Sequence, residues 1–192
     1  MSIGENERAT QDRVVSFFKD NNILDYEYLG NLKDVANKNI REDRLRAYLR
    51  LSGYSKKLID GAVMQLVKAA GDMTHGLYDA NQNVYRLLKY GAKVKETLES
   101  APKTVYFMDV KEPTNNDFAI AEEVTVVDRQ EKRPDLVIYV NGIAMAVIEL
   151  KKSSVSVSNG IRQNLTNQKD GFIAPFFTTM QFCMAGNETE GL

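Results

Sequence analysis

The sequence predicts a mixed α/β fold, in which helices cover both faces of a central sheet and a helical block is inserted into the chain. Three observations lead to this prediction. Apolar residues recur at helical spacing near the N-terminus and again over residues 33–92. Further on, two apolar runs rich in β-branched residues are joined by Asn141-Gly142, the sequence of a tight hairpin turn. A short helical segment and a last apolar run follow, which completes an α/β/α order.

The first helix is predicted over residues 5–20. Its buried stripe consists of Thr10, Val14, Phe17 and Phe18. Glu7 lies three residues before Thr10, so its side chain belongs to the edge of this stripe. As a first-turn acid, Glu7 would complement the helix dipole. Alternatively, it would supply an auxiliary carboxylate at the rim of a metal site, and the sequence leaves both interpretations open.

Residues 33–92 predict a helical block that is separate from the strand-rich part of the chain. Helices are expected over residues 41–51, 56–70 and 79–90, with Ser55 as an N-cap and Gly91 at a C-terminal end. The apolar stripes of these helices indicate packing. We therefore expect a single domain over residues 1–192, with a core of residues 1–32 and 93–192 and an insertion of residues 33–92.

The remaining chain is rich in predicted strands. These strands cover residues 104–110, 118–127, 135–140, 143–148 and 176–184. The two strands of the Asn141-Gly142 hairpin are apolar at nearly every position, which predicts central strands covered on both faces. A helix is expected from Ser158 to about Asp170, with Ile161 and Leu165 on its buried side.

Candidate catalytic residues flank this hairpin in the sequence, at its open end opposite the turn. Asp135 opens the first strand, and Glu149 and Lys151 close the second. Carboxylates from two neighbouring strands are suitable oxygen ligands for Mg²⁺. Lys151 lies two positions after Glu149 and therefore on the same face of the strand, where it could stabilise charge on a phosphate. This arrangement is typical of metal-dependent phosphodiesterases with the PD-(D/E)XK pattern, although a chain with 27% charged residues also produces such spacings by chance.

The register of the hairpin decides whether the two acids meet. An unbroken ladder on a two-residue turn would pair Asp135 with Ile148 and place Glu149 on the opposite face. A three-residue turn over residues 140–142 would instead bring Asp135, Glu149 and Lys151 to one face. We therefore predict the three-residue turn, with either a positive φ at Gly142 or a bulge in the ladder.

Two polar residues of the helix after the hairpin are candidates for substrate contacts. Gln163 and Asn167 are four residues apart, on the face opposite the predicted buried side. They would either contact the substrate backbone or simply form a solvated helix face.

Composition limits the function only broadly. With 25 basic and 26 acidic residues, the chain lacks the basic excess of a protein that grips DNA by itself. No apolar run is long enough to span a membrane, and the N-terminus does not resemble a signal peptide, so we expect a cytoplasmic protein without a membrane partner. The lone cysteine, Cys183, excludes a disulfide within the chain and is expected to be buried. The phosphate-binding pattern GxxxxGK[ST] does not occur.

Longer segments resemble the N-terminal domain of type I restriction enzyme R subunits. They are residues 5–11, 116–126, 131–142, 147–151, 160–163 and 177–187, so the similarity extends over nearly the whole chain, helical block included. The resemblance implies a PD-(D/E)XK restriction-endonuclease-like core. It matches Asp135 and Glu149 to metal-binding acids, Lys151 to a catalytic lysine and Gln163 to the glutamine of a QxxxY motif. Asn167 replaces the tyrosine of that motif, and Glu7 matches an acid of the first helix more loosely.

The resemblance further implies a Mg²⁺-dependent endonuclease that cuts double-stranded, unmodified foreign DNA away from the recognition site. The domain would be part of an ATP-driven translocase subunit, in a complex with modification and specificity subunits. ATP would bind only in the motor region, which we expect to lie beyond this fragment. Two alternatives are a catalytically silent docking module of a DNA motor complex and a stand-alone repair nuclease. The intact Asp135, Glu149 and Lys151 disfavour the first, and the net charge of −1 disfavours the second.

Overall fold

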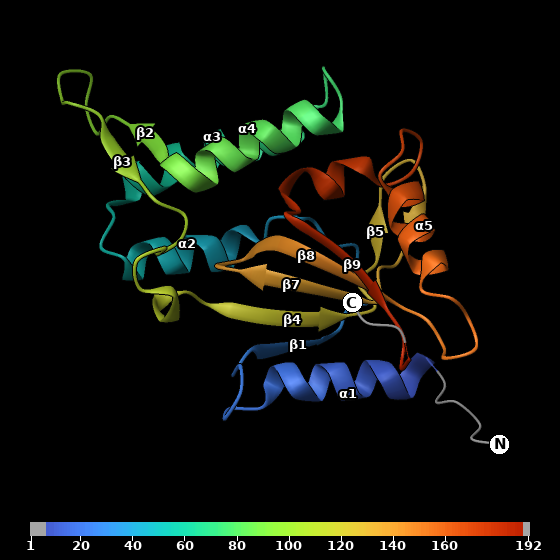
Figure 1. Cartoon of the computed structure of the whole chain (residues 1–192). Helices are drawn as coiled ribbons and strands as arrows, with labels where there is room; N and C mark the ends of the chain where they lie inside the picture. The colour runs from blue at the N-terminus through green and yellow to red at the C-terminus, as the bar shows by residue number, and fades with distance from the viewer. Residues whose placement is uncertain (1–6, 190–192) are drawn as a thin grey trace.

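The computed structural model describes residues 7–189, which form a central five-stranded sheet between helical layers (Figure 1). The strand order is β1-β4-β7-β8-β9. The strands span Glu27–Asn31 (β1), Phe118–Glu122 (β4), Leu136–Val140 (β7), Ile143–Leu150 (β8) and Phe182–Gly186 (β9). The inner strands β4, β7 and β8 are antiparallel, whereas the outer strands β1 and β9 run parallel to their neighbours. The sheet is therefore mixed, and the apolar strands β7 and β8 lie inside it, as the sequence predicts.

Helical elements cover both faces of this sheet. The helix α1 (Glu7–Lys19) runs along one side, where Val15 packs with Ile120, Ile148 and other alternate residues of the strands (Figure 1). The 3-10 helix η2 (Ala174–Thr179) packs on the opposite face, where Phe176 and Phe177 join Val137 and Val147. Residues 5 and 6 of the predicted first helix lie outside the described residues. Within the described part, Thr10 is buried as expected, but Phe17 is half exposed.

The predicted helical block is present. It contains α2 (Glu42–Leu51), α3 (Lys56–Gly71) and α4 (Leu77–Tyr90), which follow the predicted boundaries closely. The Ser55 hydroxyl accepts a hydrogen bond from the Leu58 N–H, and Gly91 ends α4 with a φ of 74°, as predicted for both residues. A two-stranded sheet of β2 (Ala92–Val94) and β3 (Lys103–Val105) packs with these helices in one apolar core, which Ile143 connects to the hairpin.

The hairpin turn differs from the prediction. Val140 pairs with Ile143, so the turn consists of two residues, Asn141 and Gly142, both with positive φ. The predicted three-residue turn is therefore wrong, but the positive φ at Gly142 and the bulge are both confirmed. The bulge lies in β8, where Met145 has no partner on β7 because Tyr139 pairs with Ala144 and Ile138 with Ala146.

Three other strands are shorter than predicted. Of the first, 104–110, only residues 104 and 105 form a strand, as part of β3. Glu123 interrupts the second with a φ of 51° before the short strand β5 (Val126–Val127), which pairs with β6 (Glu131–Lys132). The predicted last strand, 176–184, begins in the 3-10 helix η2 and becomes a strand only at Phe182. A further 3-10 turn, η1 (Pro113–Asn115), precedes β4, and β1 has no counterpart in the sequence prediction.

The helix α5 (Ser158–Asn167) is rotated relative to the prediction. Ile161 and Leu165 are 48% and 56% exposed, whereas Asn164 and Asn167 are buried. The expected burial of Ile161 and Leu165 and the expected exposure of Asn167 are therefore wrong. Cys183 is also exposed rather than buried. Among the described residues, no helix combines the length and apolar character needed to cross a membrane.

Candidate active site

Asp135, Glu149 and Lys151 meet where β7 begins and β8 ends. Leu136 pairs with Ile148, so one further step along the ladder places Asp135 opposite Glu149. Residues that face each other across an antiparallel pair project from the same face. Both acids are removed from solvent, with 9% of Asp135 and none of Glu149 exposed. The Asp135 carboxylate accepts a 2.6 Å hydrogen bond from the Leu150 N–H, which fixes it against the end of β8.

The Lys151 ammonium group lies among three carboxylates. Its Nζ is 3.9 Å from an oxygen of each of Asp135, Glu149 and Glu7, and it donates a 2.7 Å hydrogen bond to the Leu150 carbonyl. The structure thus brings Glu7, from the first turn of α1, to the rim of the same group. These four residues, Glu7, Asp135, Glu149 and Lys151, are called the carboxylate site below.

Gln163 connects α5 to the carboxylate site. Its side-chain amide donates a 2.6 Å hydrogen bond to Glu149 Oε2. The helix can approach β8 this closely because residue 160 is glycine. A Cβ at that position would lie 2.9 Å from Ala185 Cβ and 3.5 Å from Glu149 Cβ. Asn167 is buried on the same helix, but among the described residues only Gln163 of the predicted pair forms a hydrogen bond to the site.

Two further residues were missed by the sequence analysis. Gln11 lies one turn after Glu7 on α1, and its side-chain amide approaches the Asp135 carbonyl at 3.5 Å and the Glu122 carboxylate at 3.4 Å. Arg8 also pairs with the buried Glu122 at 3.1 Å. These contacts hold the start of α1 against the end of β4 and against Asp135, which directly precedes β7. The spacing of four residues between Glu7 and Gln11 is the signal that could have identified this face.

Burial shifts the pKa values of both acids upward, toward easier protonation. Burial is the largest cause that raises the pKa of Asp135, and the Leu150 N–H and Lys151 oppose it. Burial also raises the pKa of Glu149, and the negative charge of Asp135 raises it further, while Lys151 lowers it. One ammonium group therefore does not compensate fully for two buried carboxylates. A bound divalent cation would favour the ionised forms of both acids.

The donor atoms fit a hard cation such as Mg²⁺. Glu149 Oε1 is buried and has no hydrogen-bond partner, so it is available as a ligand. The Asp135 carboxylate supplies a second oxygen ligand nearby. Over residues 7–189, no three His, Cys, Asp or Glu side chains are arranged to hold a metal together. Asp135 and Glu149 would thus leave most coordination positions to water or substrate oxygens, as is usual for Mg²⁺.

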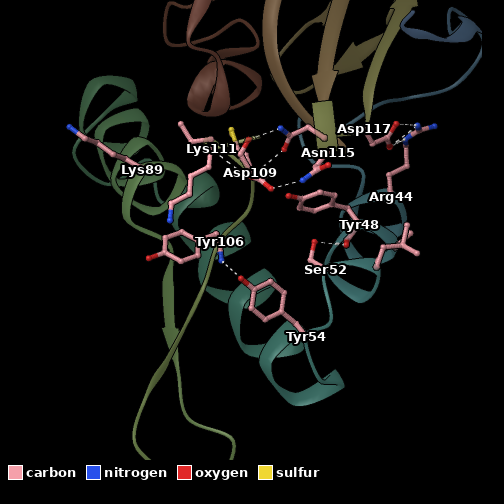
Figure 2. A pocket seen from close by; sticks show the side chains of 15 residues that line it. Arg44, Tyr48, Ser52, Tyr54, Lys89, Tyr106, Asp109, Lys111, Asn115 and Asp117 are labelled. Atoms are coloured by element: carbon pink, nitrogen blue, oxygen red, sulfur yellow. Dashed lines mark hydrogen bonds and ion pairs between the residues drawn. The ribbon is translucent and has the colours of Figure 1, made fainter. Parts of the chain in front are cut away.

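A large cavity with a different lining lies elsewhere in the described part of the molecule. It has a volume of about 1070 Å³ and is formed by α2, the end of α4 and the segment 106–117 (Figure 2). Tyr48, Tyr54 and Tyr106 contribute to its wall, and the Tyr54 hydroxyl accepts a 3.1 Å hydrogen bond from the Tyr106 N–H. None of the four residues of the carboxylate site lines it. Its volume is therefore no evidence that this cavity takes part in a reaction at the carboxylate site.

Comparisons with known proteins agree on one family. The model of the type I restriction enzyme R protein N terminus matches residues 4–192. The chain is 32% identical over 94 residues to a putative type I restriction enzyme MjaIXP endonuclease subunit of Methanocaldococcus jannaschii, an alignment that covers 45% of this chain and 9% of the relative. It is 32% identical over 100 residues to the type I restriction enzyme HindI endonuclease subunit of Haemophilus influenzae. This alignment covers 50% of this chain and 10% of the relative.

A third relative is the type I restriction enzyme SauCOLORF180P endonuclease subunit of Staphylococcus aureus, which is 27% identical over 84 residues, covering 43% of this chain and 9% of the relative. The alignments with these three relatives span about a tenth of each relative's length. The family model covers nearly the whole chain, and the mixed sheet agrees with a nuclease-like α/β fold. The chain therefore belongs to the family of type I restriction enzyme R protein N-terminal domains.

Proposed function

We propose that this domain is a Mg²⁺-dependent endonuclease that hydrolyses phosphodiester bonds of double-stranded DNA. One observation carries the proposal: Lys151 Nζ lies 3.9 Å from oxygens of both Asp135 and Glu149 at the end of the hairpin. Relatives of this family are named endonuclease subunits, which supports the same reaction class.

Each residue has a distinct role in the proposal. Asp135 and Glu149 would hold Mg²⁺, which when bound would polarise the phosphate and activate a water molecule. Lys151 would donate to the attacking water or to a phosphate oxygen as negative charge develops there. Gln163 would keep the Glu149 carboxylate in position through its 2.6 Å hydrogen bond. Glu7 would adjust the local charge through Lys151, which lies 3.9 Å away.

The proposal includes the setting of the domain. We infer that it is the nuclease part of an R subunit whose ATP-driven motor lies outside these residues, and that the subunit assembles with modification and specificity subunits. Those partners would restrict cleavage to unmodified foreign DNA and deliver the DNA by translocation, away from the recognition site. Delivery by a motor is consistent with the net charge of −1, because the nuclease part would not need to capture DNA by itself.

The test uses the complete restriction enzyme that carries this domain. Glu149→Gln and Lys151→Gln should each lower DNA cleavage by about 10²- to 10³-fold, while ATP hydrolysis continues. Glu131→Gln, which neutralises an exposed acid of β6, is the matched control and should leave both activities unchanged. Cleavage at the wild-type rate in both site variants would refute the proposal. Loss of ATP hydrolysis together with cleavage would instead support a docking module that couples the motor to its partners.

A further inference from the structure

A small cavity of about 280 Å³ adjoins the carboxylate site. It lies between α5 and the chain segment that leads from β6 toward β7, and Lys132, Arg133, Arg162 and Gln163 contribute to its wall. Gln163 also donates its hydrogen bond to Glu149, so one side chain borders both the cavity and the carboxylate site. The cavity is called the basic cavity below.

Positive charge dominates the basic cavity. The described residues that line it include three cations and no acid. Arg133 is paired with Glu123, outside the lining, at 2.9 Å. Among the described residues, Arg162 donates only to the neutral oxygens of Ser158 and Asn159. The Lys132 ammonium lies 5.0 Å from the centre of the Phe172 ring. Within residues 7–189, neither Arg162 nor Lys132 has a salt bridge to a carboxylate, so two charges remain available to an anion.

The neighbouring donors are suited to phosphate. Arginine presents a planar set of N–H donors that matches phosphate oxygens, and lysine adds a compact charge. The side chains of Asn159 and Thr166 lie on the same face of α5 as Arg162 and supply further hydrogen-bonding groups. This combination of cations with amide and hydroxyl groups is typical of surfaces that bind the nucleic acid backbone without reading its sequence.

Residues of the basic cavity and of the carboxylate site are close neighbours in the sequence. Arg133 lies two residues before Asp135, and Arg162 directly precedes Gln163. Any shift of β7 or α5 that moves the carboxylate site therefore also moves a cation of the basic cavity. A polymer with regularly spaced phosphates could occupy both places at once.

We propose that the basic cavity binds a phosphate of the DNA backbone next to the phosphate that is hydrolysed. This inference rests on the proposed function, since it takes the carboxylate site as the place of hydrolysis. The bound phosphate would fix the path of one DNA strand along α5 and the β5–β6 hairpin. Lys132 and Arg162 would then be positioning residues for the substrate, without contact with the reacting atoms.

The experiment measures duplex binding by this chain at several KCl concentrations, with Ca²⁺ in place of Mg²⁺ to limit cleavage. The site variant is Lys132→Gln/Arg162→Gln. The matched control is Arg50→Gln/Lys68→Gln, which removes the same two charges from exposed positions of α2 and α3. Arg133 is left unchanged because its loss would also free Glu123. Circular dichroism establishes that each variant is folded.

The site variant should bind the duplex on the order of 10-fold more weakly than the control. The slope of log K against log[KCl] should decrease in magnitude by about one, as expected for the loss of one phosphate contact. Equal slopes in the two variants, or no duplex binding by the wild-type chain at low salt, would overturn the inference. Binding of inorganic phosphate that depends on Lys132 and Arg162, without any effect on the duplex, would also overturn it, because the cavity would then hold only free phosphate.

The two proposals fail in different ways. Suppose that the complete enzyme never cleaves DNA with Mg²⁺, but the site variant of this chain still loses its salt-dependent contact. The endonuclease function is then wrong, and the basic cavity remains only a binding site for a backbone phosphate. If the enzyme cleaves DNA and the slopes of the two variants agree, the phosphate site is wrong and the endonuclease function stands.

Discussion

The Gln163 side-chain amide lies 2.6 Å from Glu149 Oε2 and ties α5 to the buried end of β8. Glu149 is fully buried, and its other oxygen has no hydrogen-bond partner. Gln163 is therefore the neutral donor that directly orients this carboxylate. Donors of this kind commonly determine how well an acid can serve as a metal ligand.

Replacement of Gln163 should weaken metal binding. We expect Gln163→Leu to lower the affinity for Mn²⁺ by about 10- to 100-fold, because the Glu149 carboxylate loses its orienting donor. Electron paramagnetic resonance of free Mn²⁺ during a titration measures this change. Gln168→Leu, at the C-cap of the same helix, is the control, since its amide lies 3.6 Å from Cys183 Sγ and not at the carboxylate site. Equal affinities in the two variants would contradict an orienting role for Gln163.

Stability without metal should fall as pH rises. The pKa values of Asp135 and Glu149 are raised in the folded protein, mainly by burial. The folded state therefore binds more protons than the unfolded state above about pH 4, the ordinary range of free carboxyl groups. By linkage, each such group lowers the free energy of unfolding by up to about 1.4 kcal/mol per pH unit until its raised pKa is passed. Urea unfolding with EDTA, at about pH 5 and about pH 8, measures the effect.

In the same assay, millimolar Mg²⁺ should restore stability at the higher pH, because it binds the ionised acids. Glu149→Gln should flatten the pH dependence, because it removes one of the two raised groups. If the wild-type protein in EDTA became more stable as the pH rose from the lower to the higher value, ionisation of the two buried acids would not destabilise the fold, and the prediction would be wrong.

Asp135→Asn should stabilise the metal-free protein. The asparagine carbonyl can still accept the Leu150 N–H, and the repulsion between Asp135 and Glu149 disappears. We expect a gain of roughly 1–2 kcal/mol at about pH 8, with loss of metal binding. Asp128→Asn, at an exposed position, serves as the control and should change stability little. An unchanged or lower melting temperature for Asp135→Asn would argue against close approach of the two acids.

Gly160→Ala should move α5 away from β8. The added Cβ would lie 2.9 Å from Ala185 Cβ, and neither group can rotate aside. We expect a loss of about 1–3 kcal/mol in unfolding free energy and weaker Mn²⁺ binding, since the helix carries Gln163. Gly71→Ala, at the end of α3, is the matched control because its Cβ would meet nothing within 4 Å. A Gly160→Ala protein as stable as the control would show that α5 is not tightly packed.

Asn141→Ala should destabilise the hairpin. The fully buried Asn141 adopts a φ of 52°, accepts from the Asp117 N–H and donates to the Phe107 carbonyl. Loss of these bonds should cost about 3 kcal/mol, as judged from typical buried hydrogen bonds. Chemical denaturation measures the change, with the exposed Asn83→Ala on α4 as control. A cost below about 0.5 kcal/mol would mean that water replaces these partners.

The sequence was sufficient to predict the hairpin and the convergence of its acids. Asn141-Gly142 between apolar runs has a strong and local turn preference, so the two strands could be paired from sequence alone. The position of the bulge was not predictable, because Met145 is one more apolar residue in an apolar strand. Either a longer turn or a bulge brings Asp135 and Glu149 to one face, and only packing around Met145 decides between them.

The orientation of α5 shows a different limit of prediction from sequence. Periodicity favours burial of Ile161 and Leu165, since apolar side chains usually face the core. In the structure, the helix instead turns its small and amide residues inward. Gly160 allows close contact with β8, and the Asn164 amide donates to the Met184 carbonyl. Such a tertiary hydrogen bond leaves no periodic signal in the sequence, and the same orientation brings Gln163 to Glu149.

Because Met145 is unpaired, the carboxylate site should tolerate a β8 strand that is one residue shorter but not one that is one residue longer. A β8 strand without Met145 would form a continuous ladder in which Asp135 still faces Glu149, because Ile138 already pairs with Ala146. The cost would be the contact of the Met145 side chain with the helical block and the bond from the Gln181 N–H to its carbonyl. One additional residue in β8 would instead require a second bulge or turn Glu149 to the face covered by α1. Deletion of Met145 should therefore preserve metal binding, whereas an insertion in this strand should weaken it.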